Sequence, residues 1–150
     1  YGMKAQWIMI GNDHAGTLLK DKIKKKLIEK GYLLMDFGAF TEDSVDYPDF
    51  AHAVADAMKD KPESLGILIC GSGNGMAISA NKHKHIRAGI AWNSDVASLI
   101  RRHNDANILV LPARFIQDEK AIGCVEKFLE ASFEGGRHSL RVNKIWPSMC

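Results

Sequence analysis

Short apolar runs and amphipathic stretches alternate along most of the chain. One run, Leu65–Cys70, is apolar at almost every position, as expected of a strand that is covered on both faces of a sheet. Between the runs, apolar residues recur at helical spacing, for example at Phe50, Val54 and Met58. The strands are expected at 6–10, 32–38, 65–70, 86–92 and 107–112, and the helices at 18–31, 47–60, from about 74, 94–103 and 118–132.

The regular alternation of strand and helix predicts the fold class. Parallel strands that are joined through helices form right-handed crossovers, which place helices on both faces of the sheet. We therefore expect an α/β fold with a five-stranded parallel sheet. A chain of 150 residues with 46% hydrophobic composition suits one compact domain, so 1–150 is predicted to be a single domain without a linker.

The C-terminal stretch 133–150 does not continue the alternation. Gly135 and Gly136 break the chain, and Arg137 and Arg141 follow four residues apart, on one face if the segment is helical. Such arginines often form a solvated helix face, but a guanidinium pair is also well suited to bidentate contact with phosphate. We expect this short basic extension to dock on something outside the main alternation.

Charge and cysteine content narrow the function classes. A net charge of +2, from 20 basic and 18 acidic residues, is too balanced to predict a nucleic-acid or membrane surface. The three cysteines, Cys70, Cys124 and Cys150, are odd in number and widely spaced, which argues against a disulfide framework and for a reducing compartment. The sequence contains no CxxC pair that would indicate a zinc site. The N-terminal stretch lacks the apolar core of a signal peptide. A cytoplasmic location is expected.

Polar clusters follow four of the predicted strands. Ligands of an open parallel α/β sheet bind beyond the carboxyl ends of its strands, so we expect these clusters to share one edge. In chain order they are Asn12, Asp13 and His14, then Asp46 and Tyr47, then Cys70 with its glycines, and finally Arg114.

The segment CGSGNG, which begins at Cys70, combines a thiol with a glycine loop. Three glycines at alternate positions let backbone N–H groups converge on an anion, and the following helix adds its positive end. The spacing lacks both the GxGxxG of dinucleotide sites and the lysine of a P-loop. A thiol in this position should ionise more readily than a free cysteine and act as a base or nucleophile. The structural alternative is that Cys70 is a small buried residue at a strand end.

Other polar residues also have structural interpretations. Asp13 is as well suited to capping the first helix as to binding a ligand. His103 ends a predicted helix, where a histidine often contacts the last carbonyl groups. His83 and His85 look like half of a metal site, but no carboxylate or cysteine completes it in the sequence, so a solvated turn is favoured.

Together these motifs resemble one family, the type B ribose-5-phosphate isomerases and their sugar-phosphate isomerase relatives, including the galactose-6-phosphate enzymes. Each motif alone is weak, whereas the ordered set, over roughly residues 6 to 145, is highly specific. The matching segments are DHAG at 13–16, DYPDFA at 46–51, GILICGSGNGMAISANK at 66–82, IRA at 86–88, RRHNDANIL at 101–109, ARFI at 113–116 and EGGRHSLRV at 134–142.

The resemblance implies a Rossmann-like three-layer α/β sandwich that works as a homodimer or a dimer of dimers, without a metal or an organic cofactor. It implies that the C-terminal extension reaches the neighbouring subunit. In such enzymes the cysteine of the ICGSG motif takes the proton from the sugar carbon next to the carbonyl, a role that passes to Cys70. Some members instead use a glutamate further along the loop, where this chain has Gly75 or Met76.

Further roles implied by the resemblance concern the enediolate, the sugar ring and hydroxyls, and the phosphate. The enediolate oxygens would be held by loop residues, namely Gly71, Ser72, Gly73, Asn74 and Gly75. Ring opening would fall to His103, and the hydroxyls would be placed by Asp13, Tyr47 and Asn104. The phosphate would meet residues of two subunits, His14 and Arg114 from one and Arg137 and Arg141 from the other.

The expected reaction is therefore the interconversion of ribose 5-phosphate and ribulose 5-phosphate, a step of the pentose phosphate pathway. One base must remove and return the proton, and fixed dipoles must stabilise the oxyanion. Trp92 and Asp95 depart from a TYSA-like segment of many members, which leaves open a six-carbon substrate such as allose or galactose 6-phosphate. A non-catalytic sugar-phosphate binding module is disfavoured, because a binder would not need Cys70 and His103.

Overall fold

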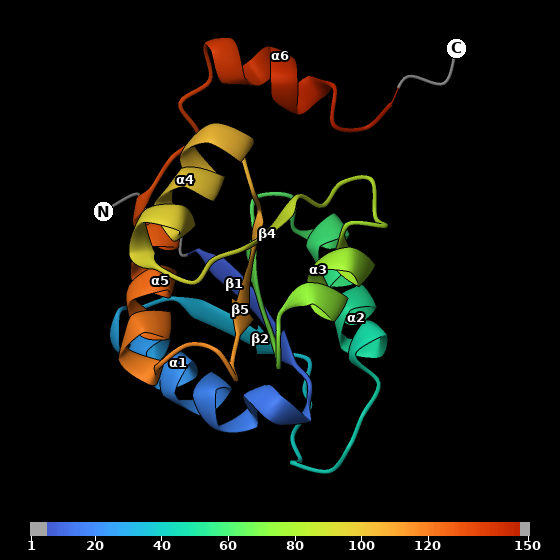
Figure 1. Cartoon of the computed structure of the whole chain (residues 1–150), viewed down its shortest axis with the longest axis vertical. Helices are drawn as coiled ribbons and strands as arrows, with labels where there is room; N and C mark the ends of the chain where they lie inside the picture. Colours follow the sequence, from blue (N-terminus) through green and yellow to red (C-terminus); the bar gives the residue numbers. More distant parts are fainter. Residues whose placement is uncertain (1–5, 148–150) are drawn as a thin grey trace.

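The computed structural model describes residues 6–147 (Figure 1). The strands are β1 (Trp7–Asn12), β2 (Leu33–Asp36), β3 (Leu65–Cys70), β4 (Ala88–Ile90) and β5 (Ile108–Pro112). The α-helices are α1 (Thr17–Glu29), α2 (Tyr47–Asp60), α3 (Asn74–Ala80), α4 (Ser94–Asn104), α5 (Asp118–Glu130) and α6 (Arg137–Asn143). A single 3-10 turn, η1 (His14–Gly16), precedes α1.

The five strands form one parallel sheet in the order β2-β1-β3-β5-β4. The chain moves in one direction across the sheet from β1 to β2 and from β4 to β5, and in the other direction from β2 to β3 and from β3 to β4. Right-handed crossovers therefore put α1 and α4 on one face and α2 and α3 on the other. Figure 1 shows the resulting three layers, with α5 beside α4, so the predicted fold class is confirmed.

Strand β3 lies at the centre of the sheet and is buried at every position, as its continuous apolar sequence predicts. Its side chains alternate between the two faces. Ile67 and Ile69 join the core beneath α1, α4 and α5, whereas Leu68 and Cys70 join the core beneath α2 and α3. The thiol of Cys70 therefore belongs to the α2–α3 side of the sheet.

Several element boundaries differ from the sequence-based expectation. Strand β1 continues to Asn12, because the Asn12 backbone still pairs with its neighbour, donating to Gly38 O at 2.6 Å and accepting from Ala39 N at 2.7 Å. Strand β4 is only three residues long. Helix α4 is capped by Asn93, whose Oδ1 accepts the N–H of Val96 at 2.9 Å, and not by Ser94 or Asp95.

The C-terminal extension contains the helix α6, so the condition under which Arg137 and Arg141 share one face is met. Figure 1 shows α6 standing beyond one edge of the sheet, next to the end of α4. Its link to the rest of the chain includes a hydrogen bond from Glu134 N–H to the carbonyl of Arg102, at 2.9 Å. Docking of this extension on a partner subunit stays a prediction.

Cys70 and Cys124 are buried free thiols on opposite faces of the sheet. Cys150, which was also expected to be free of a disulfide, lies outside the described residues. Within residues 6–147, no helix has the length and apolar character required to cross a bilayer.

Candidate active site

The loops that follow β1, β3 and β5 are joined by backbone hydrogen bonds at the carboxyl edge of the sheet. Asp13 N–H donates to Ile69 O at 3.0 Å, and Arg114 N–H donates to Gly71 O at 3.0 Å. These bonds place both loops against the end of β3, where Cys70 lies. The predicted clusters around Asp13, Cys70 and Arg114 therefore share one edge.

Cys70 is almost fully buried, with 4% of its surface exposed. Burial raises the pKa of its thiol above the ordinary value, and the N–H groups of Met76, Gly73 and Ser72 act in the opposite direction without cancelling it. The negative charge of Asp13 raises the pKa further. The expectation that this thiol ionises more readily than a free cysteine is therefore wrong for the single chain.

The glycine loop turns its backbone toward the thiol. Gly73 has φ of 83°, in the left-handed region that favours glycine, and it begins α3. Ser72 Oγ accepts the N–H of Asn74 at 3.2 Å, which holds the turn. A β-carbon at Gly71 would lie only 3.2 Å from Nη1 of Arg114, so the guanidinium rests against the loop backbone. The loop thus presents N–H groups and leaves room for an arginine.

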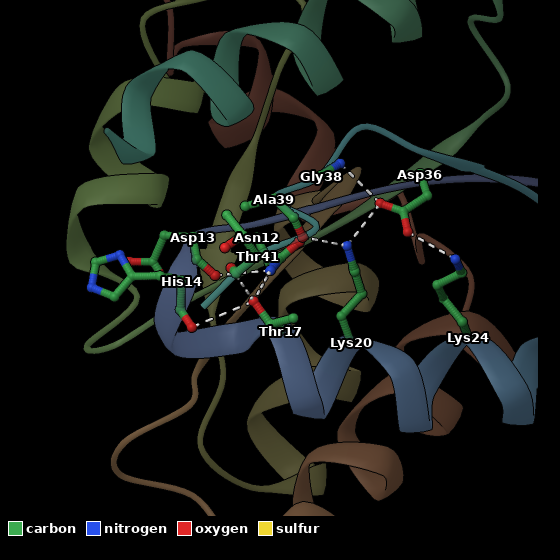
Figure 2. A network of polar contacts seen from close by, with 10 residues as sticks. All are labelled: Asn12, Asp13, His14, Thr17, Lys20, Lys24, Asp36, Gly38, Ala39 and Thr41. Atoms are coloured by element: carbon green, nitrogen blue, oxygen red, sulfur yellow. Dashed lines mark hydrogen bonds and ion pairs between the residues drawn. The ribbon is translucent and has the colours of Figure 1, made fainter. Parts of the chain in front are cut away.

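Asp13 and His14 are fixed by the turn η1. Asp13 Oδ1 accepts the N–H of Ala15 at 2.9 Å, so Asp13 caps η1, the turn that leads into α1, whereas the N-cap of α1 itself is Gly16. His14 Nδ1 accepts the N–H of Val45 at 3.3 Å, which places the proton of a neutral ring on Nε2. His14 therefore offers Nε2–H as a donor, and Figure 2 shows its ring turned away from α1.

A buried lysine supports this edge of the sheet (Figure 2). Lys20, 1% exposed, donates to Asp36 Oδ1 at 3.1 Å and to Ala39 O at 2.7 Å, and Lys24 donates to Asp36 Oδ2 at 2.8 Å. Burial alone would raise the pKa of Asp36, but the hydrogen bonds from Lys24, Gly38 N–H and Lys20 lower it below its usual value. These contacts hold the loop between β2 and α2.

A second buried contact joins the ends of β1 and α1. Asn12 is fully buried, and its Nδ2 donates to Asp13 O at 2.8 Å and to Thr17 Oγ1 at 3.2 Å. The Thr17 hydroxyl in turn donates to Thr41 O at 3.0 Å. Sequence reasoning missed the supporting role of Lys20 and Thr17, because polar residues of an amphipathic helix are normally expected to face solvent.

His103 and Asn104 lie at the opposite edge of the sheet. They end α4, just before β5, whose first residue, Ile108, pairs with Gly66 at the start of β3. Cys70 pairs with the last residue of β5, four positions further on, which is about 13 Å along the strand. One chain therefore does not bring His103 or Asn104 to Cys70, and their implied grouping with Asp13 and Tyr47, at a site between subunits, stays a prediction.

Around His103 the structure gathers side chains that the sequence analysis did not single out. The rings of His103 and His138 stack, with centroids 4.2 Å apart and planes 13° from parallel. Glu134 Oε1 lies 3.6 Å from Nε2 of each ring, and Arg102 binds the same carboxylate. The hydrogen bond from Arg102 lowers the pKa of Glu134, and burial lowers that of His138. Arg137 and Arg141 lie in α6, beside this cluster.

His83 and His85 are also better anchored than expected. His83 Nε2 lies 2.7 Å from Nδ1 of His52, and His85 Nε2 lies 2.7 Å from the carbonyl of Ala55. Both contacts join the segment after α3 to α2. The predicted turn is present, but both histidines are half-buried and bonded to α2, so the turn is less solvated than expected.

The sequence profile of the ribose/galactose isomerase family matches residues 8–145. The chain belongs to the ribose/galactose isomerase family. A probable ribose-5-phosphate isomerase B of Mycoplasma pneumoniae is 47% identical over 139 residues, which cover 92% of this chain and 91% of the relative.

Solved structures agree with this assignment. The crystal structure of a ribose 5-phosphate isomerase from Thermotoga maritima superposes with a TM-score of 0.91 at 46% identity, over 95% of this chain and 98% of that one. A ribose-5-phosphate isomerase B from Mycoplasma genitalium, solved with bound ribulose-5-phosphate, gives 0.91 at 43% identity and covers 95% of both chains. The resemblance noted from the motifs is thereby confirmed.

Tyr47 bears on which base this ribose/galactose isomerase could use. Its ring covers Gly75, where an added β-carbon would lie 2.6 Å from Cζ of Tyr47. Met76 is fully buried in the α2–α3 core. A glutamate at 75 would displace Tyr47, and one at 76 would bury a carboxylate among apolar side chains. Cys70 therefore fits the position of a base better than either site.

In this ribose/galactose isomerase the candidate residues form two separate groups. The carboxyl edge holds Asp13, His14, Tyr47, the loop from Cys70 to Gly75, and Arg114. The opposite edge holds His103, Asn104, Arg137 and Arg141. The first group can hold an oxyanion next to a thiol, and the second offers an imidazole and two guanidinium groups.

Proposed function

We propose that this protein interconverts ribose 5-phosphate and ribulose 5-phosphate, and so serves pentose phosphate metabolism. The observation that carries the proposal is a thiol at the end of β3 with the N–H groups of Ser72, Gly73 and Met76 directed at it. The relatives named ribose-5-phosphate isomerase B, and the one solved with ribulose-5-phosphate, support the same substrate pair.

The proton transfer follows from this arrangement. Cys70 as thiolate removes the proton from C2 of the open-chain aldose, and the C–H electron pair forms the C1–C2 double bond of an enediolate. The carbonyl electrons move to O1, where the N–H groups of the loop stabilise the negative charge. The thiol then returns the proton to C1 while the O2 proton passes to O1, which gives the ketose. The raised pKa of Cys70 makes its thiolate a stronger base toward carbon once it has formed.

The catalytic site of this proposal is shared between two copies of the chain. His103, which would open the furanose ring, and Asn104 come from the copy that does not supply Cys70. The support is the separation of the two groups by the length of β5, together with the position of α6 beyond the sheet (Figure 1). A homodimer is the smallest assembly that completes such a site, and a dimer of dimers contains the same pair.

Phosphate binding is divided in the same way. The copy that supplies Cys70 contributes His14, with Nε2–H as donor, and Arg114, which lies against Gly71. The other copy contributes Arg137 and Arg141, four residues apart on α6. The phosphate is remote from the reacting carbons, and binding it would keep C1 and C2 next to the thiol. The glycine loop is then reserved for the enediolate.

A coupled assay with ribose 5-phosphate tests the proposed function. The wild-type protein should turn over ribose 5-phosphate, and Cys70→Ala should reduce kcat by about 10²–10⁴-fold while substrate binding persists. Cys124→Ala, which removes the thiol buried on the other face, is the matched control and should keep wild-type kcat. Allose and galactose 6-phosphate are run in parallel. Wild-type turnover in Cys70→Ala would remove the thiol from the chemistry, and a higher kcat/KM for a six-carbon phosphate would replace the proposed substrate.

A further inference from the structure

The ring of His103 is covered on one face by the ring of His138. The ring centroids lie 4.2 Å apart and the planes are 13° from parallel, so the contact is a stack. His138 is only 9% exposed, whereas 33% of the His103 side chain is open to solvent. One imidazole is therefore held inside the protein, and it supports a second imidazole that a ligand can still reach.

The stack is the contact that sets the plane of the His103 ring. Nε2 of His103 lies 3.6 Å from Glu134 Oε1, which is too long for a hydrogen bond. In the part of the chain that the structure describes, the His103 side chain makes no hydrogen bond. The ring of a histidine has a broad range of χ2 angles unless a neighbour restricts it. Contact with His138 supplies that restriction.

The charges around the stack keep the supporting ring neutral. Burial lowers the pKa of His138, and the positive charges of His103 and of the arginines in α6 act in the same direction. Glu134 opposes them, but its carboxylate is already paired with Arg102, through Nη2 at 2.6 Å and Nε at 2.7 Å. His138 therefore stays uncharged at neutral pH, so a proton on His103 does not face a second imidazolium.

The role of the stack rests on the proposed function, in which His103 opens the furanose ring. In that step the C1–O4 bond breaks and its electron pair goes to O4, together with a proton from the His103 ring. The O1 hydroxyl releases its proton to solvent as the C1=O1 carbonyl forms. Such a transfer requires a donor that points at O4. We propose that His138 is a positioning residue for this step, because its stack fixes the plane of the His103 ring.

Helix α6 joins this support to phosphate binding. His138 follows Arg137 directly and precedes Arg141 by three residues, and α6 lies next to the end of α4 (Figure 1). In the proposed site the two arginines bind the phosphate of the same substrate that His103 opens. One short helix thus holds both the phosphate and the support of the imidazole, which fixes His103 relative to the bound sugar.

A second pair of histidines provides a matched control. The rings of His52 and His83 are tilted by 57°, with centroids 4.9 Å apart, and Nδ1 of His52 lies 2.7 Å from Nε2 of His83. This pair joins α2 to the segment after α3 and contains no residue assigned to the reaction. His83→Ala should therefore leave ring opening unchanged.

Two reactions of the same protein separate ring opening from proton transfer. Isomerisation of ribose 5-phosphate, followed by a coupled assay, needs both steps. Ribulose 5-phosphate cannot close to a furanose, because its O5 carries the phosphate. Exchange of its C1 hydrogen with deuterated water, followed by NMR spectroscopy, therefore needs Cys70 and no ring opening. Both rates are measured at protein concentrations at which ultracentrifugation shows the same assembly for variant and wild type.

We expect His138→Ala to lower kcat for ribose 5-phosphate by about 10–10²-fold and to keep the wild-type exchange rate. His103→Ala should show the same pattern with a larger loss of isomerisation, whereas Cys70→Ala should lose both reactions. His138→Phe keeps an aromatic face against His103, so it should recover most of the isomerisation. His83→Ala should match the wild type in both reactions.

Equal losses of isomerisation and exchange in His138→Ala would assign the residue a general structural role and overturn the proposal. Wild-type isomerisation in that variant, or no recovery in His138→Phe, would overturn it as well. Ring-current shifts of the His103 proton resonances test the stack without turnover, and they should be lost in His138→Ala and retained in His138→Phe. A wild-type protein that shows these shifts but neither isomerises nor exchanges the sugar phosphates would refute the proposed function and leave the stack in place.

Discussion

At the scale of single residues, Cys70 is both a core residue and a candidate base. Its side chain packs in the α2–α3 core, which agrees with the alternative that Cys70 is a small buried residue at a strand end. The same side chain receives N–H groups from the glycine loop. Burial without these donors would leave an inert thiol, and the donors without burial would leave a weaker base. The combination of burial and N–H donors suits proton transfer to and from carbon.

Gly75 is the residue at which a single methyl group should matter most. An alanine there would overlap the ring of Tyr47, whereas Gly123, in α5, has only Ser94 Oγ within 4 Å, at 3.2 Å. We expect Gly75→Ala to displace Tyr47 and lower kcat/KM for ribose 5-phosphate at least tenfold. Gly123→Ala should keep activity and gain about 0.5–1 kcal/mol of helix stability. Kinetics and urea unfolding of both variants make the comparison.

Equal kcat/KM for Gly75→Ala and wild type would show that the position of Tyr47 over the loop has no part in the reaction. A loss of activity in Gly123→Ala of the same size would mean that the effect is a general response to a bulkier helix residue.

At the scale of elements, α1 does more than cover the sheet. Lys20 reaches from α1 to Asp36 and Ala39, and Thr17 reaches from its first turn to Thr41 (Figure 2). These contacts fix the segment that leads to Val45, which in turn orients His14. The position of a candidate phosphate ligand thus depends on a buried ion pair that is remote from the chemistry.

The ion pair of Asp36 should carry a large part of local stability. Asp36→Asn leaves the buried ammonium of Lys20 without its counter-charge, so unfolding in urea should show a loss of about 3 kcal/mol. The control is Asp118→Asn, which breaks an exposed pair with Lys22 and should cost less than about 1 kcal/mol. Equal losses in the two variants would contradict the assigned role of burial.

The same pair predicts a pH dependence. The folded-state pKa of Asp36 is lowered from 3.8, so its contribution is present above that unfolded value and is lost as pH falls through the lower folded pKa. The stability difference between wild type and Asp36→Asn should therefore be constant near neutral pH and shrink below about pH 4. Urea unfolding at a series of pH values measures it, and a difference that stays constant down to acid unfolding would contradict the shift.

The elements show where sequence reasoning succeeds. The bounds of β3 and α2 were predicted to the residue, because a continuous apolar run ends at a glycine and Pro48 marks a helix start. The length of β4 was not, since Ile86 and Ala91, which flank it, are buried apolar residues and extend the apparent strand pattern. The cap Asn93 was missed because Ser94 and Asp95, which follow it, are equally good capping residues.

The position of His103 away from Cys70 within one chain could have been inferred from the sequence. In a parallel sheet, each crossover helix runs back from the carboxyl edge, so a residue at its end lies at the amino edge. His103 ends α4 and had to lie away from Cys70 for that reason. The cluster with Glu134 and His138 could not be foreseen, because it depends on how the extension folds back on α4.

At the scale of the whole molecule, the C-terminal extension is the part with the least contact to its own chain. Leu140 is 65% exposed and Ile145 is 57% exposed, on and just after α6. Large apolar side chains clustered on an extended helix are typical of a surface that another chain covers. In the proposed shared site, a second copy of the same chain covers that surface.

Leu140 therefore offers a test of the assembly. Leu140→Asp should weaken the dimer at least tenfold and make activity depend on protein concentration, as followed by analytical ultracentrifugation and by assay. Ile28→Asp, on the outer end of α1 with 63% exposure, is the control and should leave the dimer intact. A dimer of wild-type strength in Leu140→Asp, or dissociation of Ile28→Asp, would place the interface elsewhere.

The most direct test of the central claim is complementation between two inactive variants. In a verified mixed dimer of Cys70→Ala and His103→Ala chains, a shared site leaves one of two sites with both residues, so about half of the wild-type kcat per dimer should return. A site built within one chain leaves no intact site in any mixture. Recovery is the result predicted here, and a mixed dimer as inactive as its parents would contradict the account.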